Sequence, residues 1–267
     1  MAPPQLDTVL TEMDGSIGII RFNRPKNANA LSTQLMKDVL AALQWATNEA
    51  DVRVIVFTGV GRFYTSGMDL VGVPSDGPVL SDEAIDTLSD LASSIHETLI
   101  KTSKTTIAAV NGPAAGWGTS SIALFDLVYS VPDAIFFTPF VKWGLCAEGC
   151  SSVTFMKIMG RQKAASLILA GERMTPQELE SAGLISKILP KENFFEDVMK
   201  IARRVVAQPP GALKFSKELM MAPIRDELLA ANQRECAGLA ERGRTDEPRQ
   251  AIAAFEVEQK ARRKAKL

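Results

Sequence analysis

The sequence predicts an α/β fold in which strands and helices alternate around a parallel sheet. Short β-branched apolar runs alternate with segments of helical period before residue 149, and the pattern is almost wholly helical after it. We therefore expect an α/β core over residues 1–200. Residues 201–267 are expected to form a helical C-terminal region, which is either a smaller subdomain or a surface for assembly.

Each strand is predicted from a short run rich in Val, Ile, Phe or Tyr. The segment from Ser16 to Phe22 alternates between apolar and other side chains, which is typical of a strand with a buried face. Further runs share this character and are bounded by turn residues. They cover 52–59, 105–112, 126–131 and 134–139.

Helices are predicted where apolar residues recur every three or four positions. Ser32 can cap a helix that runs to about Glu49, and Ser81 begins a similar segment that ends near Lys101. Another helix opens after the glycines that follow residue 112. In the last part of the chain, helices are expected over 150–159, 161–170, 175–182, 194–208, 210–221, 224–242 and 246–264.

The composition is that of an ordinary globular protein, with 267 residues of which 46% are hydrophobic and 23% are charged. The 30 basic and 31 acidic side chains nearly cancel, so the net charge gives no case for nucleic-acid binding. No apolar run reaches the roughly 18 residues of a membrane span, and the first ten residues lack the layout of a signal peptide. We therefore expect neither a nucleic-acid partner nor a membrane partner.

The chain has three cysteines, Cys146, Cys150 and Cys236, and a single histidine, His96. Cys146 and Cys150 have no second pair that would complete a metal site, so we expect no metal and favour free thiols in a reducing compartment. His96 lies on a predicted helix between Ile95 and Glu97. This mixed setting predicts a surface or boundary position for the imidazole.

Two loops share a design in which a strand runs into a glycine-rich turn that opens toward a helix. The first loop spans Gly61 to Leu70, and the second spans Asn111 to Ser120. Glycine lets the backbone turn sharply and approach a ligand closely, so two such turns could aim two N–H donors at one oxygen. The alternative is that the glycines only make tight turns in a compact core. Neither loop fits a nucleotide-binding fingerprint.

Glu148 is the one acid in the largely apolar stretch PFVKWGLCAEGCSS, from Pro139 to Ser152. Apolar neighbours would desolvate a carboxylate, raise its pKa and make it a stronger base. The alternative is a structural role at the start of the following helix, where the helix dipole favours a negative charge. Both roles can hold at once.

Four segments together resemble the crotonase, or enoyl-CoA hydratase/isomerase, superfamily: FNRPKNANAL, RFYTSGMDL, AAVNGPAAGWG and TPFVKWGLCAEGCSS. The similarity runs from about Thr8 to Met221, and the segment from Ala147 to Ser152 looks like that of the peroxisomal Δ3,Δ2-enoyl-CoA isomerases. The resemblance implies a crotonase-like fold of repeated ββα units with an α-helical C-terminal trimerisation region. It also implies acyl-CoA thioester substrates, with CoA as part of the substrate and no separate cofactor.

The resemblance also implies roles for the residues of the candidate site. Glu148 would be the catalytic proton shuttle, and the main-chain N–H groups of Met68 and Trp117 would form an oxyanion hole. Asp69 is more suited to anchor its loop by hydrogen bonding than to act as a base. Residues implied to bind the substrate are Ser66, Gly67, Met68, Asp69, Leu70, Gly116, Ala28 and Ala30.

The sequence departs from the hydratases of this superfamily at both positions where they carry catalytic glutamates. Ser120 and Phe140 stand there, so hydration by the two-acid route is not expected. The favoured function is an isomerase that moves the double bond of 3-enoyl-CoA to the 2-trans position in fatty-acid β-oxidation. The alternatives are another acyl-CoA enzyme, hydratase-like or from secondary metabolism, and a non-catalytic acyl-CoA-binding subunit.

The C-terminal residues Ala265-Lys266-Leu267 resemble the S-K-L peroxisomal address, with Ala in place of Ser and basic residues before it. We therefore expect an interaction with the peroxisomal import receptor and a peroxisomal location. The alternative is a solvated basic helix end. The superfamily resemblance further implies a homotrimer or a hexamer.

Overall fold

The computed structural model describes residues 2–69 and 81–264. The expected substrate residue Leu70 and the expected address Ala265-Lys266-Leu267 lie outside the described residues. The strands are β1 (Val9–Asp14), β2 (Ile17–Phe22), β3 (Val54–Gly59), β4 (Thr105–Val110), β5 (Ala114–Ala115), β6 (Leu127–Ser130), β7 (Phe136–Phe137) and β8 (Lys187–Ile188). The helices are α1 (Thr33–Asn48), α2 (Asp82–Lys101), α3 (Trp117–Ser120), α4 (Ser151–Ile168), α5 (Pro176–Ser181), α6 (Phe194–Val206), α7 (Pro210–Met221), α8 (Arg225–Gly243) and α9 (Glu247–Lys264), with 3-10 turns η1 (Pro25–Asn27), η2 (Ser121–Leu124) and η3 (Val141–Trp143).

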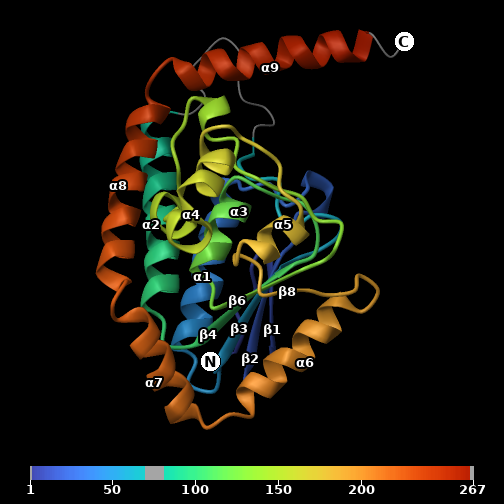
Figure 1. The fold of residues 1–267 in the computed structure, drawn as a ribbon, viewed down its shortest axis with the longest axis vertical. Coiled ribbons are helices and arrows are strands. Elements are labelled where there is room, and N and C mark those ends of the chain that lie inside the picture. The colour runs from blue at the N-terminus through green and yellow to red at the C-terminus, as the bar shows by residue number, and fades with distance from the viewer. Residues whose placement is uncertain (1, 70–80, 265–267) are drawn as a thin grey trace.

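A six-stranded sheet in the order β1-β2-β3-β4-β6-β8 forms the centre of the molecule (Figure 1). β1 and β2 are an antiparallel hairpin, and every other neighbouring pair in this sheet is parallel. Ile17 pairs with Val54, and Val54 pairs with Thr105. The strands β2, β3 and β4 therefore start side by side, and their carboxyl ends lie together at the opposite end of the sheet. β5 and β7 make a separate two-stranded parallel sheet. The prediction of an α/β fold around a parallel sheet is confirmed.

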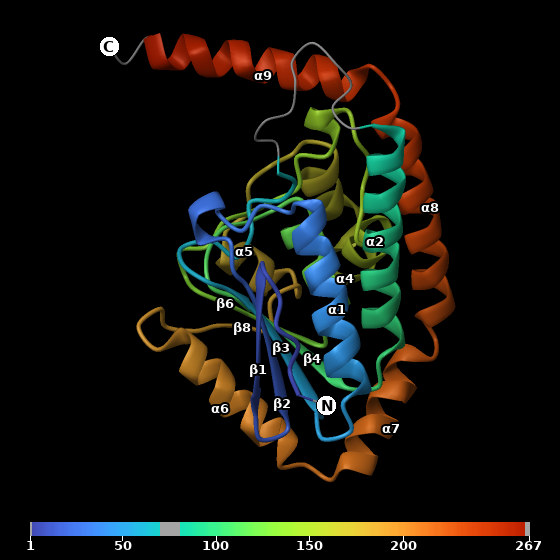
Figure 2. The same cartoon turned by 180° about the vertical axis from the view of Figure 1, so that it is seen from behind.

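Helices cover the two faces of the main sheet (Figure 2). α6 packs against β2, β3 and β4 on one face, whereas α1 packs against β1 and β2 on the other and is followed outward by α2 and α8. α1 joins β2 to β3 and α2 joins β3 to β4, as parallel neighbours require a crossover connection. α9 extends away from the body and contacts it at η3 (Figure 1).

Helix boundaries follow the capping and breaking residues of the sequence. Ser32 and Ser81 each accept a hydrogen bond from a main-chain N–H three residues later, at 3.2 Å in both cases, and so cap α1 and α2 as predicted. Gly160 interrupts α4 with a φ of 78°, which separates the two pieces predicted over 150–159 and 161–170. β1 is not evident from the sequence, because it is an edge strand in which only Val9 is buried.

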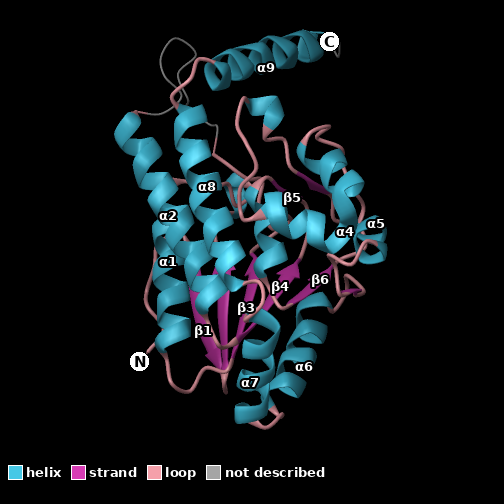
Figure 3. Cartoon of the chain, turned by 60° about the vertical axis from the view of Figure 1, so that its left-hand side comes forward, coloured by secondary structure: helices cyan, strands magenta, loops and turns pink. Residues whose placement is uncertain are grey.

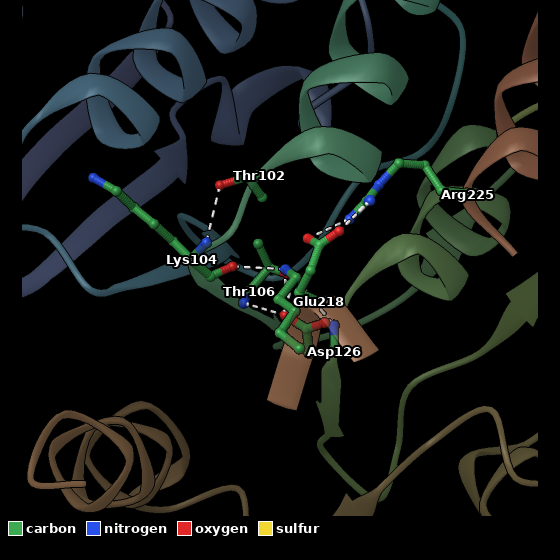
Figure 4. A network of polar contacts seen from close by, with 7 residues as sticks. Thr102, Lys104, Thr106, Asp126, Glu218 and Arg225 are labelled. Carbon is green, nitrogen blue, oxygen red and sulfur yellow. Dashed lines mark hydrogen bonds and ion pairs between the residues drawn. The ribbon is translucent and has the colours of Figure 1, made fainter. Parts of the chain in front are cut away.

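An ion pair between Lys217 and Asp126 joins α7 to the residues that precede β4 and β6 (Figure 4). The Lys217 ammonium donates to Asp126 Oδ2 at 2.7 Å and to the main-chain oxygen of Lys104 at 2.6 Å, and Lys217 is only 7% exposed. Asp126 Oδ2 also accepts the main-chain N–H of Thr106 in β4 at 2.7 Å. Asp126 therefore joins α7, β4 and the segment that leads into β6.

Replacing Lys217 with Met should leave the Asp126 carboxylate buried without its cation. Removing one partner of a buried pair costs about 3–5 kcal/mol, so the urea midpoint of Lys217→Met should fall clearly below that of the wild type. Lys214→Met, on an exposed turn of the same helix, should change the free energy of unfolding by no more than about 0.5 kcal/mol. Equal midpoints for the two variants would contradict a stabilising role for the pair.

Candidate active site

The two glycine-rich loops meet beyond the ends of the parallel strands, where β5 and α4 lie (Figure 3). The first loop follows β3 and the second follows β4. A parallel bridge joins Thr65 to Ala114, and another joins Leu31 to Met68. The Ala115 N–H donates to the Thr65 carbonyl oxygen at 3.0 Å. The first loop is therefore held between the segment at Leu31 and the second loop.

Gly67 and Gly116 lie against each other where these loops meet. Both have positive φ, 79° and 54°, which favours glycine. A Cβ on Gly67 would lie 3.0 Å from the Ala115 carbonyl oxygen and 3.7 Å from the Gly116 nitrogen. The contact therefore excludes a side chain at Gly67 and brings two turns of main chain against each other.

Hydrogen bonding fixes the direction of the Met68 N–H group. The Gly67 carbonyl accepts the N–H of Leu31 at 2.8 Å, so it points toward Leu31. The N–H and the carbonyl of one trans peptide point in opposite directions, so the Met68 N–H points away from Leu31, toward the side of the second loop. This N–H has no hydrogen-bond acceptor within the described ranges 2–69 and 81–264.

The N–H group of Trp117 is directed by the same principle. The Gly116 carbonyl accepts the N–H groups of Thr119 and Ser120 at 2.9 and 3.0 Å, so it points into α3. The Trp117 N–H of the same peptide therefore points out of the helix, and it too lacks an acceptor in the part of the chain that the structure describes. Two main-chain donors thus flank the Gly67–Gly116 contact.

Glu148 lies opposite this contact. Its Oε1 atom is 3.8 Å from the point where a Cβ on Gly116 would stand, and the ring of Phe140 is 4.0 Å from the same point. The residue is partly exposed, yet protein atoms surround the carboxyl group. Desolvation, followed by the negative charge of Glu235, raises the pKa of Glu148 from 4.5 to about 8. The carboxyl group is therefore poised to exchange a proton near neutral pH.

Glu235 is a second buried acid beside Glu148, and it was not anticipated from the sequence. It comes from α8, is 7% exposed, and accepts the main-chain N–H of Ser152 at 2.9 Å through Oε1. Burial raises the pKa of Glu235, while its bonds to Ser152 and Cys150 lower it. The glutamate therefore satisfies the first turn of α4, directly after the Glu148 segment, and places a charge near Glu148.

The two positions where hydratases carry glutamates hold no acid here. Ser120 is fully buried, and its hydroxyl makes only long hydrogen bonds of 3.4 Å to the carbonyls of Gly116 and Trp117. The Ser120 Oγ lies 2.8 Å from the point where a Cβ on Gly149 would stand. Ser120 is therefore packed against the main chain that follows Glu148, and Phe140 presents its ring to the same region.

Of the other expected substrate residues, Ser66 and Asp69 lie in the first loop, and Ala28 and Ala30 lie beside it. Arg24 donates to Asp69 at 2.9 Å and to the Ala30 carbonyl at 2.5 Å, which confirms Asp69 as a loop anchor. The Ser66 N–H donates to the Ala28 carbonyl at 3.0 Å, and Ala28 adopts a φ of 51°. The structure therefore brings the Ala28–Ala30 segment alongside residues 66–69.

The expectation of a surface or boundary position for His96 is wrong. His96 is 1% exposed and lies beside Trp117, whose indole Nε1 donates to His96 Nε2 at 2.8 Å. The sequence of α2 alone could not show this, because α8 covers the imidazole from a position far along the chain. The Trp117 indole is 2% exposed and so points into the core, away from solvent.

The three cysteines are free thiols, and Cys150 and Cys236 are buried. Burial raises the pKa of Cys146, Cys150 and Cys236, so they stay protonated at neutral pH. Within residues 2–69 and 81–264, no group of three or more His, Cys, Asp or Glu side chains is placed to hold a metal ion. None of the described helices has the length and apolar character needed to span a membrane.

Comparison with proteins of known name identifies the family of the chain. Residues 12–265 match the model of the Enoyl-CoA hydratase/isomerase family. The chain is 36% identical over 247 residues to Enoyl-CoA delta isomerase 2 of Rattus norvegicus, which aligns 92% of this chain with 63% of that protein. It is 34% identical over 249 residues to Enoyl-CoA delta isomerase 3, peroxisomal, of Mus musculus, with 93% of this chain and 78% of that protein aligned. The chain thus spans less than two thirds of the rat relative's length.

A solved structure shares the whole architecture. It is the enoyl-CoA hydratase/isomerase from Pseudoalteromonas atlantica T6c, which superposes with a TM-score of 0.84 at 26% identity and covers 94% of this chain and 98% of that one. This likeness confirms the crotonase-like fold expected from the sequence. The chain therefore belongs to the enoyl-CoA hydratase/isomerase family, within the crotonase superfamily.

Proposed function

We propose that the protein is a Δ3,Δ2-enoyl-CoA isomerase, which moves the double bond of a 3-enoyl-CoA to the 2-trans position. The observation that carries this proposal is the position of the Glu148 carboxyl group opposite the contact of Gly67 with Gly116, which is flanked by the Met68 and Trp117 N–H groups, neither of which has an acceptor among the described residues. Relatives of this chain named enoyl-CoA delta isomerase support the same reaction. The chemistry needs no cofactor other than the CoA of the substrate.

The reaction begins when Glu148 removes a proton from C2 of the thioester. The C2–H electron pair moves toward the carbonyl, and the negative charge of the resulting dienolate develops on the thioester oxygen. We assign the Met68 and Trp117 N–H groups as donors to that oxygen, because preorganised donors stabilise charge that appears only in the transition state. Loss of one such donor typically costs about 10²–10³ in rate.

The reaction ends when Glu148 returns the proton to C4, and the C3=C4 double bond becomes C2=C3. One carboxyl group can serve both atoms because they lie on the same face of the planar dienolate. The raised pKa of Glu148 suits both steps, since a base near neutrality takes and releases a proton with comparable ease. The surrounding protein also slows exchange of the abstracted proton with water.

Hydration by the two-acid route requires two carboxylates to place and activate water, and Ser120 and Phe140 stand at those two positions. Glu235 replaces neither of them, because its Oε1 accepts the Ser152 N–H at the start of α4. These features favour isomerisation over hydration on the same scaffold.

The substrate would lie along the first loop. We propose that Ser66, Gly67, Met68, Asp69, Leu70, Gly116, Ala28 and Ala30 contact the CoA and acyl portions of the substrate. We also propose a homotrimer or hexamer, and a peroxisomal location through Ala265-Lys266-Leu267, in fatty-acid β-oxidation. The name of the mouse relative, Enoyl-CoA delta isomerase 3, peroxisomal, supports this location.

Incubating the protein separately with 3-enoyl-CoA and 2-enoyl-CoA tests the reaction class. We expect conversion of the 3-enoyl to the 2-enoyl thioester and no 3-hydroxyacyl-CoA, measured by chromatography and mass spectrometry of the thioesters. Formation of the 3-hydroxy product at a comparable rate would instead identify a hydratase-like enzyme. Acyl-CoA binding without turnover of either thioester would identify a non-catalytic binding protein.

Replacing Glu148 with Gln should remove isomerisation while acyl-CoA binding is kept. The amide has a similar shape but cannot take a proton, so kcat should fall by at least about 10³-fold, whereas the Kd for a saturated acyl-CoA should change little. Near wild-type turnover would reject Glu148 as the shuttle.

The pH dependence of the Tm tests whether the Glu148→Gln variant keeps the wild-type fold. The pKa of Glu148 is about 8 in the folded chain and 4.5 as the ordinary value, so the wild type loses stability as pH rises from about 4.5 through 8. The Gln variant lacks this loss. Its Tm should therefore match the wild type at low pH and exceed it increasingly toward pH 8.

The pH dependence of kcat/KM should report the Glu148–Glu235 pair. Glu148 must be ionised to act as the base, so kcat/KM should rise with pH to a plateau above about 8. Glu235→Gln keeps an oxygen for the Ser152 N–H but removes the charge, so the midpoint should move to lower pH. Glu227→Gln, an exposed residue on the same helix, makes the same charge change at the surface and should leave the midpoint in place. An identical shift for both variants would contradict local coupling.

A further inference from the structure

A continuous series of hydrogen bonds runs from Trp117, in the second glycine loop, to the packed helices α2 and α8. The Trp117 indole Nε1 donates to His96 Nε2 at 2.8 Å, and His96 Nδ1 contacts Asn232 Oδ1 at 2.8 Å. The Asn232 amide then donates to the carbonyl and hydroxyl oxygens of Ser93 at 3.1 and 3.0 Å. The chain therefore links α3 to α2 and α8. His96 is the only histidine in the sequence.

The partners dictate one tautomer of His96. An indole N–H can only donate, so His96 Nε2 must be the unprotonated nitrogen that accepts it. The single ring proton of the neutral imidazole then lies on Nδ1 and is donated to Asn232 Oδ1. Burial lowers the pKa of His96 to about 4, which keeps the ring neutral and the acceptor available. His96, Trp117 and Asn232 are 1%, 2% and 0% exposed, so no water competes for these bonds.

The ring planes strengthen this arrangement. The His96 and Trp117 ring centroids are 6.3 Å apart and the ring planes are 21° from parallel, so the two rings lie nearly in one plane, joined by the hydrogen bond at their edges. Phe22 makes a T-shaped contact with the same indole, with centroids 6.3 Å apart. The indole is thus held by a hydrogen bond at its edge and by an aromatic contact with Phe22. Its Cα belongs to the peptide that follows Gly116, where the main chain has a φ of 54° and a ψ of −120°.

We propose that His96 is a positioning residue of the isomerase, which fixes the Trp117 side chain and thereby the direction of the Trp117 main-chain N–H. This inference rests on the proposed function, in which that N–H donates to the thioester oxygen. The bond from His96 does not touch the substrate. It acts by restraining the first residue of α3, whose preceding glycine has no side chain of its own to hold the turn.

The expected effect of losing this restraint is on turnover more than on binding. A donor that is misdirected binds the neutral thioester almost as well but stabilises the dienolate poorly, so kcat should fall more than KM changes. Small displacements of reacting groups cost up to about 10²-fold in rate. The side chain of Asn232 acts one step further out, because it orients His96.

Three variants of the full-length chain test the proposal. His96→Phe keeps an aromatic ring but offers Trp117 no acceptor, and its kcat should fall about 10–100-fold while KM stays within about threefold. His96→Gln can still accept from the indole and donate to Asn232, and it should recover most of the lost kcat. Leu99→Ala, a buried change on the same helix α2 that leaves the hydrogen bonds of His96 in place, should lower the Tm yet leave kcat unchanged.

The free protein gives a second readout that is independent of turnover. After labelling with ¹⁵N-histidine, the one imidazole should show a protonated Nδ1 and an unprotonated Nε2 at pH 7. An Nε2–H tautomer would overturn the proposal, because that nitrogen could not accept the indole proton. A wild-type kcat in His96→Phe would also overturn it while leaving the proposed function intact. Absence of isomerase activity in the wild-type protein would overturn both the proposed function and the role of His96.

Discussion

The candidate site depends on two turns of main chain that meet at Gly67, where the second loop leaves little room for a side chain. Gly67 has a positive φ, and a Cβ there would lie 3.0 Å from the Ala115 carbonyl oxygen. Because β3 and β4 are parallel neighbours, their following loops emerge at the same edge, and the bridge of Thr65 with Ala114 sets their separation. The directions of the Met68 and Trp117 N–H groups and the setting of Glu148 all follow from this contact.

The electrostatics of the site work against the stability of the fold. Glu148 and Glu235 are both desolvated, and the negative charge of Glu235 makes Glu148 ionise still less readily. The N–H of Ser152 offsets part of this cost at Glu235 only. A chain shaped by stability alone would place apolar residues here, so the pair is best understood as the cost of a carboxyl group that exchanges protons near neutrality.

Local pattern was sufficient for most of the fold and for the parts of the site that are local in sequence. The helix caps at Ser32 and Ser81, the break near residue 160 and both glycine loops are all encoded within a few residues. Glu235 and the burial of His96 were beyond this reach, because each depends on α8 packing against residues more than 80 positions away. The sequence around Glu235 carries Arg234 beside it and has the composition of an exposed helix face.

The two proposed donors are peptide N–H groups, so backbone conformation determines where they lie, and the identity of the side chain does not. The side chains at positions 68 and 117 can therefore change while the two main-chain donors keep their positions. In this protein the side chain of Trp117 is buried in the core, whereas that of Met68 is 42% exposed. A scaffold of this kind can acquire a new reaction by relocating a single acid, which gives a physical route from one catalyst of thioester chemistry to another.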